Sequence, residues 1–459
     1  MILVAEYLLR SVGHHMRRAG VRVSNGIIDS VGTVEELKAV YPADEVRDYG
    51  PAVIMPGFVN AHSHLDHAMM DGVIADAPYA TWKAVLEDKS SRLTKEDYND
   101  SALIGALYCI RGGITTVSDV TRNGASLRAA AATGLHGLFV RQVKATEKRE
   151  VPIAMERADE DIRRWRSKTG DKGITIGIGP GTLYQTHPEV LGAIGDYAKD
   201  GTPVVVHMAG SREECDFIRY GTAPLSAARS SNLAGRTEQP AAFLPMGVSP
   251  VRYALNWGIL YAPNVMAIHC IHVDDEDIQR LGENNVRVVV CPRSNAKLGC
   301  GVAPVMKLWD GGLTVGLGTN TPASSGMFDM FEEMRTQLLL ERGLMGERYE
   351  MGDDTFLSAK HMMLMSTIDS ARAIGMQNEV GSLEVGKRAD LVVLDVSDSN
   401  QMPTTSPNAM VVHDCGRMDV IATMIDGKFV YTSYDGYLCD VDIDRLLARA
   451  SEIRAKLRG

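Results

Sequence analysis

Hydrophobic residues gather along this chain in short runs separated by longer stretches of mixed polarity. Runs such as Val204-Val-Val-His207 and Val265-Met-Ala-Ile-His269 are almost continuously apolar, as strands buried on both faces of a parallel sheet are. The stretches between runs, such as 101–111, 153–168 and 276–284, are typical of helices. The pattern predicts eight strands, over residues 53–64, 114–120, 135–143, 174–180, 203–208, 265–270, 286–292 and 313–320.

Eight strand–helix units over roughly 270 residues predict an α/β fold of the (β/α)8 TIM-barrel type, in which chemistry sits at the carboxyl ends of the strands. A doubly wound open sheet is the second possibility. The sequence has no glycine-rich phosphate loop to favour it.

The two ends of the chain have a different pattern, with short apolar runs joined by tight turns. Asn25-Gly26 and Asp426-Gly427 each separate two apolar runs, which is a strong hairpin signal. Short β segments on both sides of a long middle predict one small β-sandwich domain built from both termini. We therefore expect residues 1–55 and 380–435 to form this domain, 56–379 the barrel, and 436–459 a C-terminal amphipathic helix.

Composition narrows the class of protein. Among 459 residues, 45% are hydrophobic and 23% charged, as in ordinary globular enzymes. The net charge of −10 argues against nucleic acid or an anionic membrane as a partner. No apolar stretch approaches the roughly 20 residues of a membrane helix, and the N-terminus does not resemble a signal peptide. Seven cysteines without framework spacing suit reduced thiols. We expect a cytoplasmic enzyme.

Histidines and one amide end several of the predicted strands. His62 and His64 end the first and face the same side of an extended segment, because side chains alternate with period two. His207 ends the fifth, His269 the sixth with His272 one turn later, and Asn320 the eighth. Three neutral imidazoles with an open position are typical of a catalytic zinc site, whose metal acidifies a bound water. We expect surface or packing roles for the histidines without such a setting: His14, His15, His136, His361 and His413.

The segment Pro56-Gly-Phe-Val-Asn-Ala-His-Ser-His64 resembles the signature of the amidohydrolase superfamily, in the branch with triazine hydrolases, guanine deaminase and S-adenosylhomocysteine deaminases. The resemblance runs through most of the chain, on the segments 112–119, 207–209, 269–272, 291–298, 317–320, 329–335 and 381–391. It implies that His62, His64 and His207 bind a metal and that His269 handles protons or the substrate oxygen. No lysine ends the fourth strand, where binuclear relatives carry a carboxylated one, so the resemblance implies one metal.

Two departures from the family pattern bear on the reaction. The family's eighth-strand aspartate is here Asn320, an amide that can ligate or orient water but cannot be its base. The glutamate that deaminases carry three residues after the fifth-strand histidine is here Gly210, with Glu213 and Glu214 further on. The amide resembles the small group of phenylurea and thiocarbamate hydrolases.

These observations leave three functions open. The leading hypothesis is a hydrolase in which a metal-bound water attacks the carbonyl carbon of a small urea, carbamate, thiocarbamate or amide and expels an amine or thiol. The alternative is a deaminase or dechlorinase of an N-heterocycle, with Glu213 replacing the missing glutamate. The third is a ligand-binding protein without activity.

The site that we expect has His269, Asn320 and His272 as catalytic residues, and Tyr184 and Glu213 as substrate-binding residues. Its cofactor would be one divalent transition metal, most simply zinc, with cobalt, manganese or iron as other options, bound by His62, His64, His207 and Asn320. Asp66 and His67 would support these ligands. We expect a small-molecule substrate and a homo-oligomer, either a dimer or a tetramer.

Overall fold

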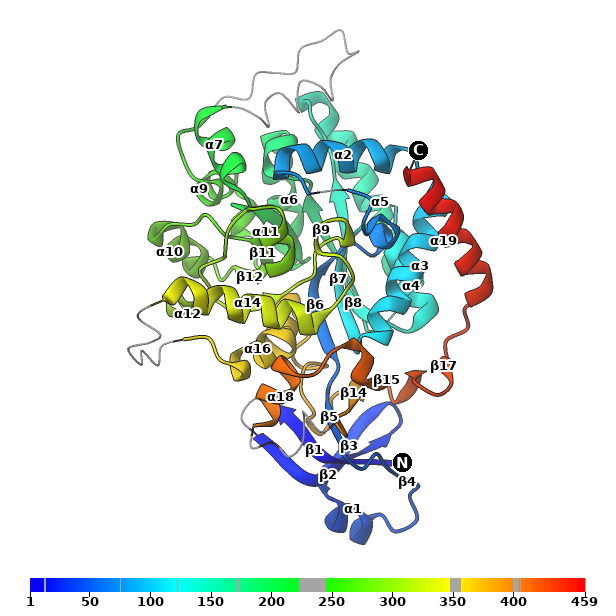
Figure 1. Ribbon diagram of the computed structural model, residues 1–459. Coiled ribbons are helices and arrows are strands. Elements are labelled where there is room, and N and C mark those ends of the chain that lie inside the picture. Colours follow the sequence, from blue (N-terminus) through cyan, green and yellow to red (C-terminus); the bar gives the residue numbers. More distant parts are fainter. Residues whose placement is uncertain are drawn as a thin grey trace.

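An eight-stranded parallel barrel forms the centre of the molecule (Figure 1). The computed structural model describes all residues except 12–13, 75, 122, 171–172, 223–244, 347–355, 399–403, 405 and 459. The barrel strands, in spatial order, are β6 (Phe58–Ser63), β7 (Ile114–Thr121), β8 (His136–Val143), β9 (Ile174–Pro180), β10 (Val204–Met208), β11 (Val265–His269), β12 (Arg287–Val290) and β13 (Val315–Leu317). Asn320 donates its backbone N–H to the His62 carbonyl at 2.9 Å, which joins the last strand to the first. The predicted (β/α)8 fold is confirmed.

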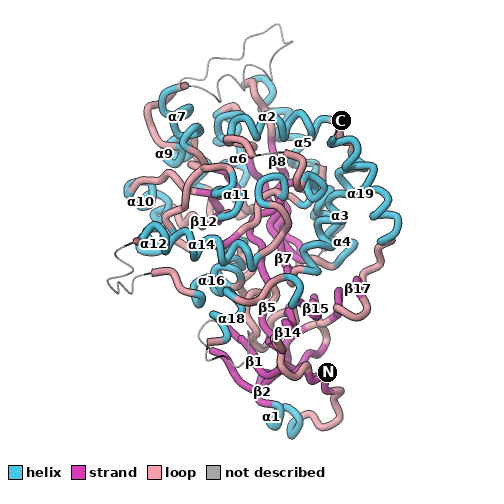
Figure 2. The backbone as a smooth tube through the Cα atoms, viewed as in Figure 1, coloured by secondary structure: helices cyan, strands magenta, loops and turns pink. Residues whose placement is uncertain are grey.

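Helices surround these strands, as the cyan tubes around the magenta core of Figure 2 show. They are α2 (Tyr79–Ser91), α3 (Lys95–Arg111), α4 (Ala125–Thr133), α5 (Val151–Thr169), α6 (Pro188–Tyr197), α7 (Arg212–Tyr220), α9 (Pro250–Asn256), α10 (Asp275–Glu283), α11 (Pro292–Lys297), α12 (Val305–Asp310), α13 (Pro322–Ser325), α14 (Met330–Met345), α16 (Ala359–Ser366), α17 (Ile368–Ile374) and α18 (Pro407–His413).

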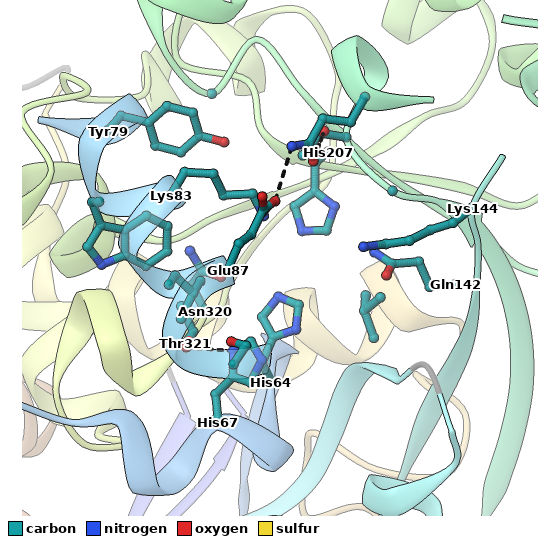
Figure 3. Close-up of a pocket in the computed structure, with 18 of the residues that line it drawn as sticks. His64, His67, Tyr79, Lys83, Glu87, Gln142, Lys144, His207, Asn320 and Thr321 are labelled. Atoms are coloured by element: carbon teal, nitrogen blue, oxygen red, sulfur yellow. Dashed lines mark hydrogen bonds and ion pairs between the residues drawn. The ribbon is translucent and has the colours of Figure 1, made fainter. Parts of the chain in front are cut away.

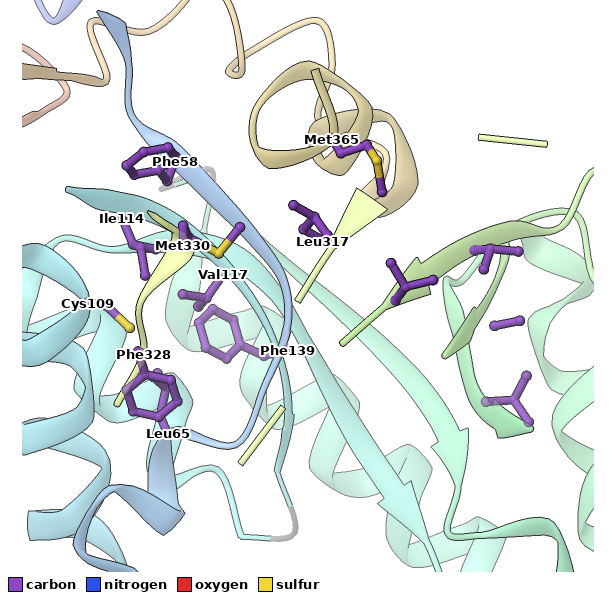
Figure 4. Close-up of a cluster of buried hydrophobic side chains, with 14 of the residues drawn as sticks. Phe58, Leu65, Cys109, Ile114, Val117, Phe139, Leu317, Phe328, Met330 and Met365 are labelled. Atoms are coloured by element: carbon purple, nitrogen blue, oxygen red, sulfur yellow. The ribbon is translucent and has the colours of Figure 1, made fainter. Parts of the chain in front are cut away.

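The apolar runs of the sequence are buried on both faces of the barrel strands. On β10, Val204 and Val206 belong to the large cluster that includes the outer helices, whereas Val205 belongs to a second, smaller cluster. The ring of Phe58 packs edge-on against Phe331 of α14, with centroids 4.9 Å apart. Figure 4 shows Phe58 in a cluster of buried side chains from β6, β7, β8 and the surrounding helices. This packing holds the carboxyl ends of the strands in fixed positions.

Both chain ends contribute to a second, mixed sheet of nine strands, at the bottom of Figure 1. Both predicted hairpins are present: Asn25-Gly26 and Asp426-Gly427 have positive φ at both residues, as a type I′ turn requires. Helix α1 (Val34–Val40) follows β3. The strands are β1 (Ile2–Ser11), β2 (His14–Ser24), β3 (Ile27–Thr33), β4 (Val46–Asp48), β5 (Ala52–Pro56), β14 (Leu391–Asp395), β15 (Val420–Ile425), β16 (Lys428–Thr432) and β17 (Gly436–Tyr437). The domain boundaries given above stay predictions.

The first predicted strand, 53–64, is in fact two strands in two sheets. β5 pairs with β1 and β14 of the terminal sheet, and β6 pairs with β7 of the barrel. Pro56-Gly57 makes the break, and a Cβ at Gly57 would lie 2.3 Å from the Thr115 side chain, so only glycine fits this close crossing. An unbroken apolar pattern hid the change of sheet.

His136, expected to lack a polar setting, is the centre of a buried ion-pair cluster between the barrel and the terminal sheet. Its Nδ1 lies 2.7 Å from Asp390 Oδ2 and its Nε2 lies 3.0 Å from Asp426 Oδ2. Arg388 completes the cluster with a 2.8 Å bond to the other oxygen of Asp426. The sequence analysis missed this because both aspartates are more than 250 residues away.

The last helix, α19 (Ile443–Arg458), packs on α3 at the outside of the barrel (Figure 1, red). Buried Asp97 accepts from Arg449 and Lys456, and Asp100 accepts from Arg445 and Arg449. Within the part of the chain that the structure describes, none of the helices has the length and apolar character needed to cross a membrane.

Candidate metal centre and active-site cavity

Four histidines converge at the carboxyl end of the barrel. His62 and His64 come from the end of β6, His207 from β10 and His269 from the end of β11. Donor nitrogens of His62, His64 and His207 all lie within 4.8 Å of one another. The His269 ring is 5.8 Å from that of His207, centroid to centroid. The structure therefore brings together the histidines that the strand-end pattern singled out.

Three of these histidines suit a zinc-type metal. Burial lowers the pKa values of His62 and His207 well below the usual value, and the neighbouring histidines lower them further. Both rings are therefore neutral near pH 7, the form that binds metal. Their Nε2 atoms are 3.1 Å apart, close to the about 3.3 Å expected for two nitrogens on a tetrahedral zinc. With His64, they fit one metal ion with room for a further ligand.

Asn320 lies beside this cluster and is held on both its backbone and its side chain. Its backbone carbonyl accepts from His64 N–H at 3.2 Å, and its side-chain nitrogen donates to Ser294 Oγ at 2.8 Å. With the nitrogen bonded to Ser294, the oxygen is the part of the amide that remains to bind or orient another group. The amide can orient a ligand or water here but cannot take a proton.

His269 is arranged to accept a proton. Its Nδ1 lies 3.0 Å from Asn295 Oδ1, and an amide oxygen accepts only, so Nδ1 carries the hydrogen and Nε2 keeps its lone pair. Burial lowers the pKa of His269 to about 4, so the ring is neutral at pH 7. Its φ of 80° is unusual for a residue with a side chain, and Ala209 beside it also has positive φ. Strained backbone of this kind clusters at functional sites.

The histidines open into a cavity of about 670 Å³ whose other wall is helix α2. Its lining contains Tyr79, Trp82, Lys83 and Glu87 from α2, and Lys83 pairs with Glu87 at 3.6 Å. Figure 3 shows Tyr79, Lys83 and Glu87 on one side of His64 and His207, with Gln142 and Lys144 on the other. The volume is in the usual range for a small-molecule site. The sequence analysis missed α2, since nothing in its pattern distinguishes it from other surface helices.

Of the two neighbouring glutamates, Glu214 lines this cavity, whereas we expected Glu213; Asp66, Glu87 and Glu150 also contribute carboxyl groups to the lining. Ser211 caps α7 by accepting from Glu214 N–H, which sets the helix register so that Glu214 faces the barrel. Glu214 Oε2 accepts from Gly210 N–H at 2.8 Å, its Oε1 is buried without a partner among the described residues, and burial raises its pKa to about 7. Glu213 is not among the described residues lining the cavity.

Two further expected site residues lie outside the cavity lining formed by the described residues. His272 Nε2 is bonded to the Cys300 carbonyl at 2.8 Å, which makes it a packing residue. Tyr184 is buried, and its hydroxyl lies 3.0 Å from that of Tyr79, which does line the cavity.

Asp66 and His67 do line the cavity, as a support role requires. The His67 ring stacks on His64 at 5.4 Å between centroids, and its Nδ1 lies 3.2 Å from Thr321 Oγ1. Their support of the ligands stays a prediction.

Solved structures with the same fold have bound zinc. The adenosine deaminase of Xanthomonas campestris with bound zinc superposes with a TM-score of 0.83 at 24% identity, covering 100% of this chain and 98% of that one. The atrazine chlorohydrolase of Arthrobacter aurescens TC1, complexed with zinc, gives 0.80 at 20% identity, covering 98% of this chain and 100% of that one. At these identities the likeness establishes the fold.

Sequence comparisons establish the family. The 5-methylthioadenosine/S-adenosylhomocysteine deaminase of Moorella thermoacetica is 30% identical over 448 residues, covering 94% of each chain. The Amidohydrolase family profile matches residues 53–430, which span β5, the whole barrel and most of the C-terminal strands. With the histidine cluster at the carboxyl end of a closed barrel, these matches lead to one conclusion: the chain belongs to the Amidohydrolase family.

Proposed function

We propose that the protein is a metal-dependent hydrolase that replaces an amino group, or another leaving group such as chloride, on a ring carbon of a small N-heterocycle with the oxygen of water. This was the alternative hypothesis from the sequence, and it now has more support than the hydrolysis of a urea, carbamate, thiocarbamate or amide. The observation that carries it is Glu214, whose pKa of about 7 keeps a protonated carboxyl available in the cavity near neutral pH. Such a group can protonate a ring nitrogen. The deaminase and chlorohydrolase relatives support the same chemistry.

His62, His64 and His207 would hold one divalent metal per chain, zinc in the simplest case. A metal bound there supplies an acidified water and polarises the substrate. His269 accepts a proton at Nε2, because its Nδ1 hydrogen is committed to Asn295. Asn320 orients groups beside the metal ligands through its amide oxygen, with its nitrogen anchored on Ser294.

Glu214 and His269 would divide the proton transfers between them. Burial pushes their pKa values in opposite directions, to about 7 for the carboxyl and to about 4 for the imidazole. Near neutral pH the Glu214 carboxyl can therefore donate a proton, whereas the neutral His269 ring can only accept one. Opposite pKa shifts of this kind separate the acid and base roles within one site. Trp82 and Leu86 from α2 add apolar surface to the cavity lining.

A second candidate is the hydrolysis of a urea, carbamate or thiocarbamate, which Asn320 favours. An amide beside the metal ligands removes the usual carboxylate base, and a carbonyl carbon with a good leaving group needs less proton transfer than an aminopurine. The likeness to phenylurea and thiocarbamate hydrolases belongs to this candidate. A homo-oligomeric assembly also remains part of the proposal.

The test is a two-panel assay of the zinc-loaded protein. Ammonia or chloride release from aminopurines, pterins and s-triazines would support the first candidate, and amine or thiol release from phenylureas and thiocarbamates the second. His207→Ala is the matched control, and it should lose both metal and turnover. A wild-type protein that binds no metal and turns over neither panel would refute both candidates and leave a ligand-binding protein.

A further inference from the structure

Asp119 lies at the end of β7 with its side chain fully buried, next to the segment that carries His64. Its Oδ2 accepts from Ser63 Oγ at 3.0 Å and from Leu65 N–H at 2.6 Å. Ser63 and Leu65 are the residues directly before and after His64. A single carboxylate oxygen therefore bonds to the side chain directly before, and to the backbone directly after, a proposed metal ligand; the Ser63 hydroxyl also lies 3.1 Å from the Ser118 carbonyl of β7.

The local structure explains why this segment needs an outside acceptor. β6 ends at Ser63, and His64 begins a 3-10 helix over Leu65–Met70 without providing a side-chain cap. The first N–H groups of a helix lack intrahelical partners, and Asp119 satisfies that of Leu65. The pairing of β6 with β7 shifts register between Asn60 and Ser63 and resumes at Ser63 with Asp119. The end of β6 is therefore positioned by its bonds to Asp119 and not by continuous pairing with β7.

His64 is held from the opposite side as well. Its own N–H donates to the Asn320 carbonyl at 3.2 Å, which ties it to the strand that closes the barrel. The segment around His64 is therefore bonded on two sides, to Asn320 just after β13 and to Asp119 on β7. Without the Asp119 carboxylate, the Leu65 N–H would lose its acceptor and the Ser63 hydroxyl would keep only the Ser118 carbonyl, so the imidazole could swing away from His62 and His207.

We propose that Asp119 is a positioning residue that sets the direction of His64 and thereby the affinity of the three-histidine site for its metal. This inference rests on the metal ligands of the proposed function and not on the substrate. Groups that orient metal ligands typically contribute 10- to 100-fold to metal affinity. Asp119 does so through its bonds to Ser63 Oγ and Leu65 N–H, on either side of the ligand.

The experiment measures the zinc dissociation constant by competition with a chelator, together with the melting temperature of the metal-free protein. Asp119→Ala should weaken zinc binding about 10- to 100-fold. Asp119→Asn, whose amide oxygen can still accept both bonds, should recover most of the affinity. Ser118→Ala is the matched control, since its buried hydroxyl, one residue away on β7, has no partner among the described residues; it should bind zinc like the wild type.

A double-mutant cycle separates positioning from general damage to the fold. In a His64→Ala background, Asp119→Ala should cause no further loss of zinc affinity, since there is no ligand left to position. An equal loss in both backgrounds, or unchanged affinity in folded Asp119→Ala, would overturn the inference. If Asp119→Ala does not fold, Ser63→Ala, which removes one of the two bonds to Asp119, decides by the same cycle.

The outcome is separable from that of the proposed function. If replacing His62 or His207 by alanine leaves the zinc affinity unchanged, the assignment of the metal ligands is wrong. If those replacements weaken zinc binding but Asp119→Ala does not, only the inference about Asp119 fails.

Discussion

The His136 cluster predicts a stability that depends on pH in a defined window. Burial disfavours a charged ring, but the charges of Asp390 and Asp426 and the bonds to them outweigh it and raise the pKa of His136 to about 9, from 6.5. A raised pKa in the folded state stabilises the protein in full below about pH 6.5, and this contribution is lost as the pH rises through about 9.

The size of this contribution to the free energy of unfolding follows from the shift in the pKa of His136. At 1.36 kcal/mol per pH unit, the change from 6.5 to about 9 corresponds to about 3 kcal/mol. A chain of this length has an unfolding entropy of about 1 kcal/mol/K, so the contribution is worth about 3 °C in melting temperature if the chain unfolds as one unit. Replacing His136 by Asn also leaves Asp390 buried without its charged partner, which costs about 3–5 kcal/mol at low pH.

Thermal unfolding followed by circular dichroism between pH 6 and pH 10 tests this reasoning. We expect the wild type to melt above His136→Asn by several degrees at pH 6.5, with the difference shrinking by about 3 °C towards pH 10. Other titrating groups are shared by the two proteins and cancel. His413→Asn, at an exposed histidine at the end of α18, is the control and should follow the wild type. A difference independent of pH would show that His136 is not charged in the folded protein.

Four further predictions concern the cavity. His207→Ala should remove zinc and activity together, and elemental analysis with full metal occupancy would contradict the ligand assignment. His269→Asn should lower kcat by about 10² or more, whereas a change confined to KM would mean that it only binds substrate. Wild-type kcat should fall as the pH rises through about 7, the pKa to which burial raises Glu214; Glu214→Gln should be slow and lack this fall, and Glu213→Gln should keep it. Asn320→Asp adds a negative charge beside the metal ligands, which should raise the pKa of the attacking water, so that activity drops at neutral pH and partly returns at alkaline pH. Undiminished activity of that variant at pH 7 would mean that the amide is a tolerated substitution.

The local sequence pattern was sufficient to predict the strands and the end of the barrel at which the key histidines lie. Apolar runs marked all eight barrel strands, although the first run also took in β5 of the terminal sheet. In β10 and β11 the run is nearly continuous, because a strand buried on both faces has no polar side to interrupt it. His207 and His269 end their strands in the sequence and therefore lie at the same edge of the barrel, where parallel strands end together. Asn25-Gly26 was sufficient for its hairpin, since a two-residue turn needs positive φ at both positions.

Only the tertiary structure decided which polar groups meet. Glu214 rather than Glu213 lines the cavity because the cap at Ser211 sets the register of α7, and one residue turns a helical side chain by about 100°. His136 finds its aspartates 254 and 290 residues further along the chain. Local periodicity reports which face of an element is buried, but the partner of a buried polar group comes from a distant segment, and only the folded chain brings the two together.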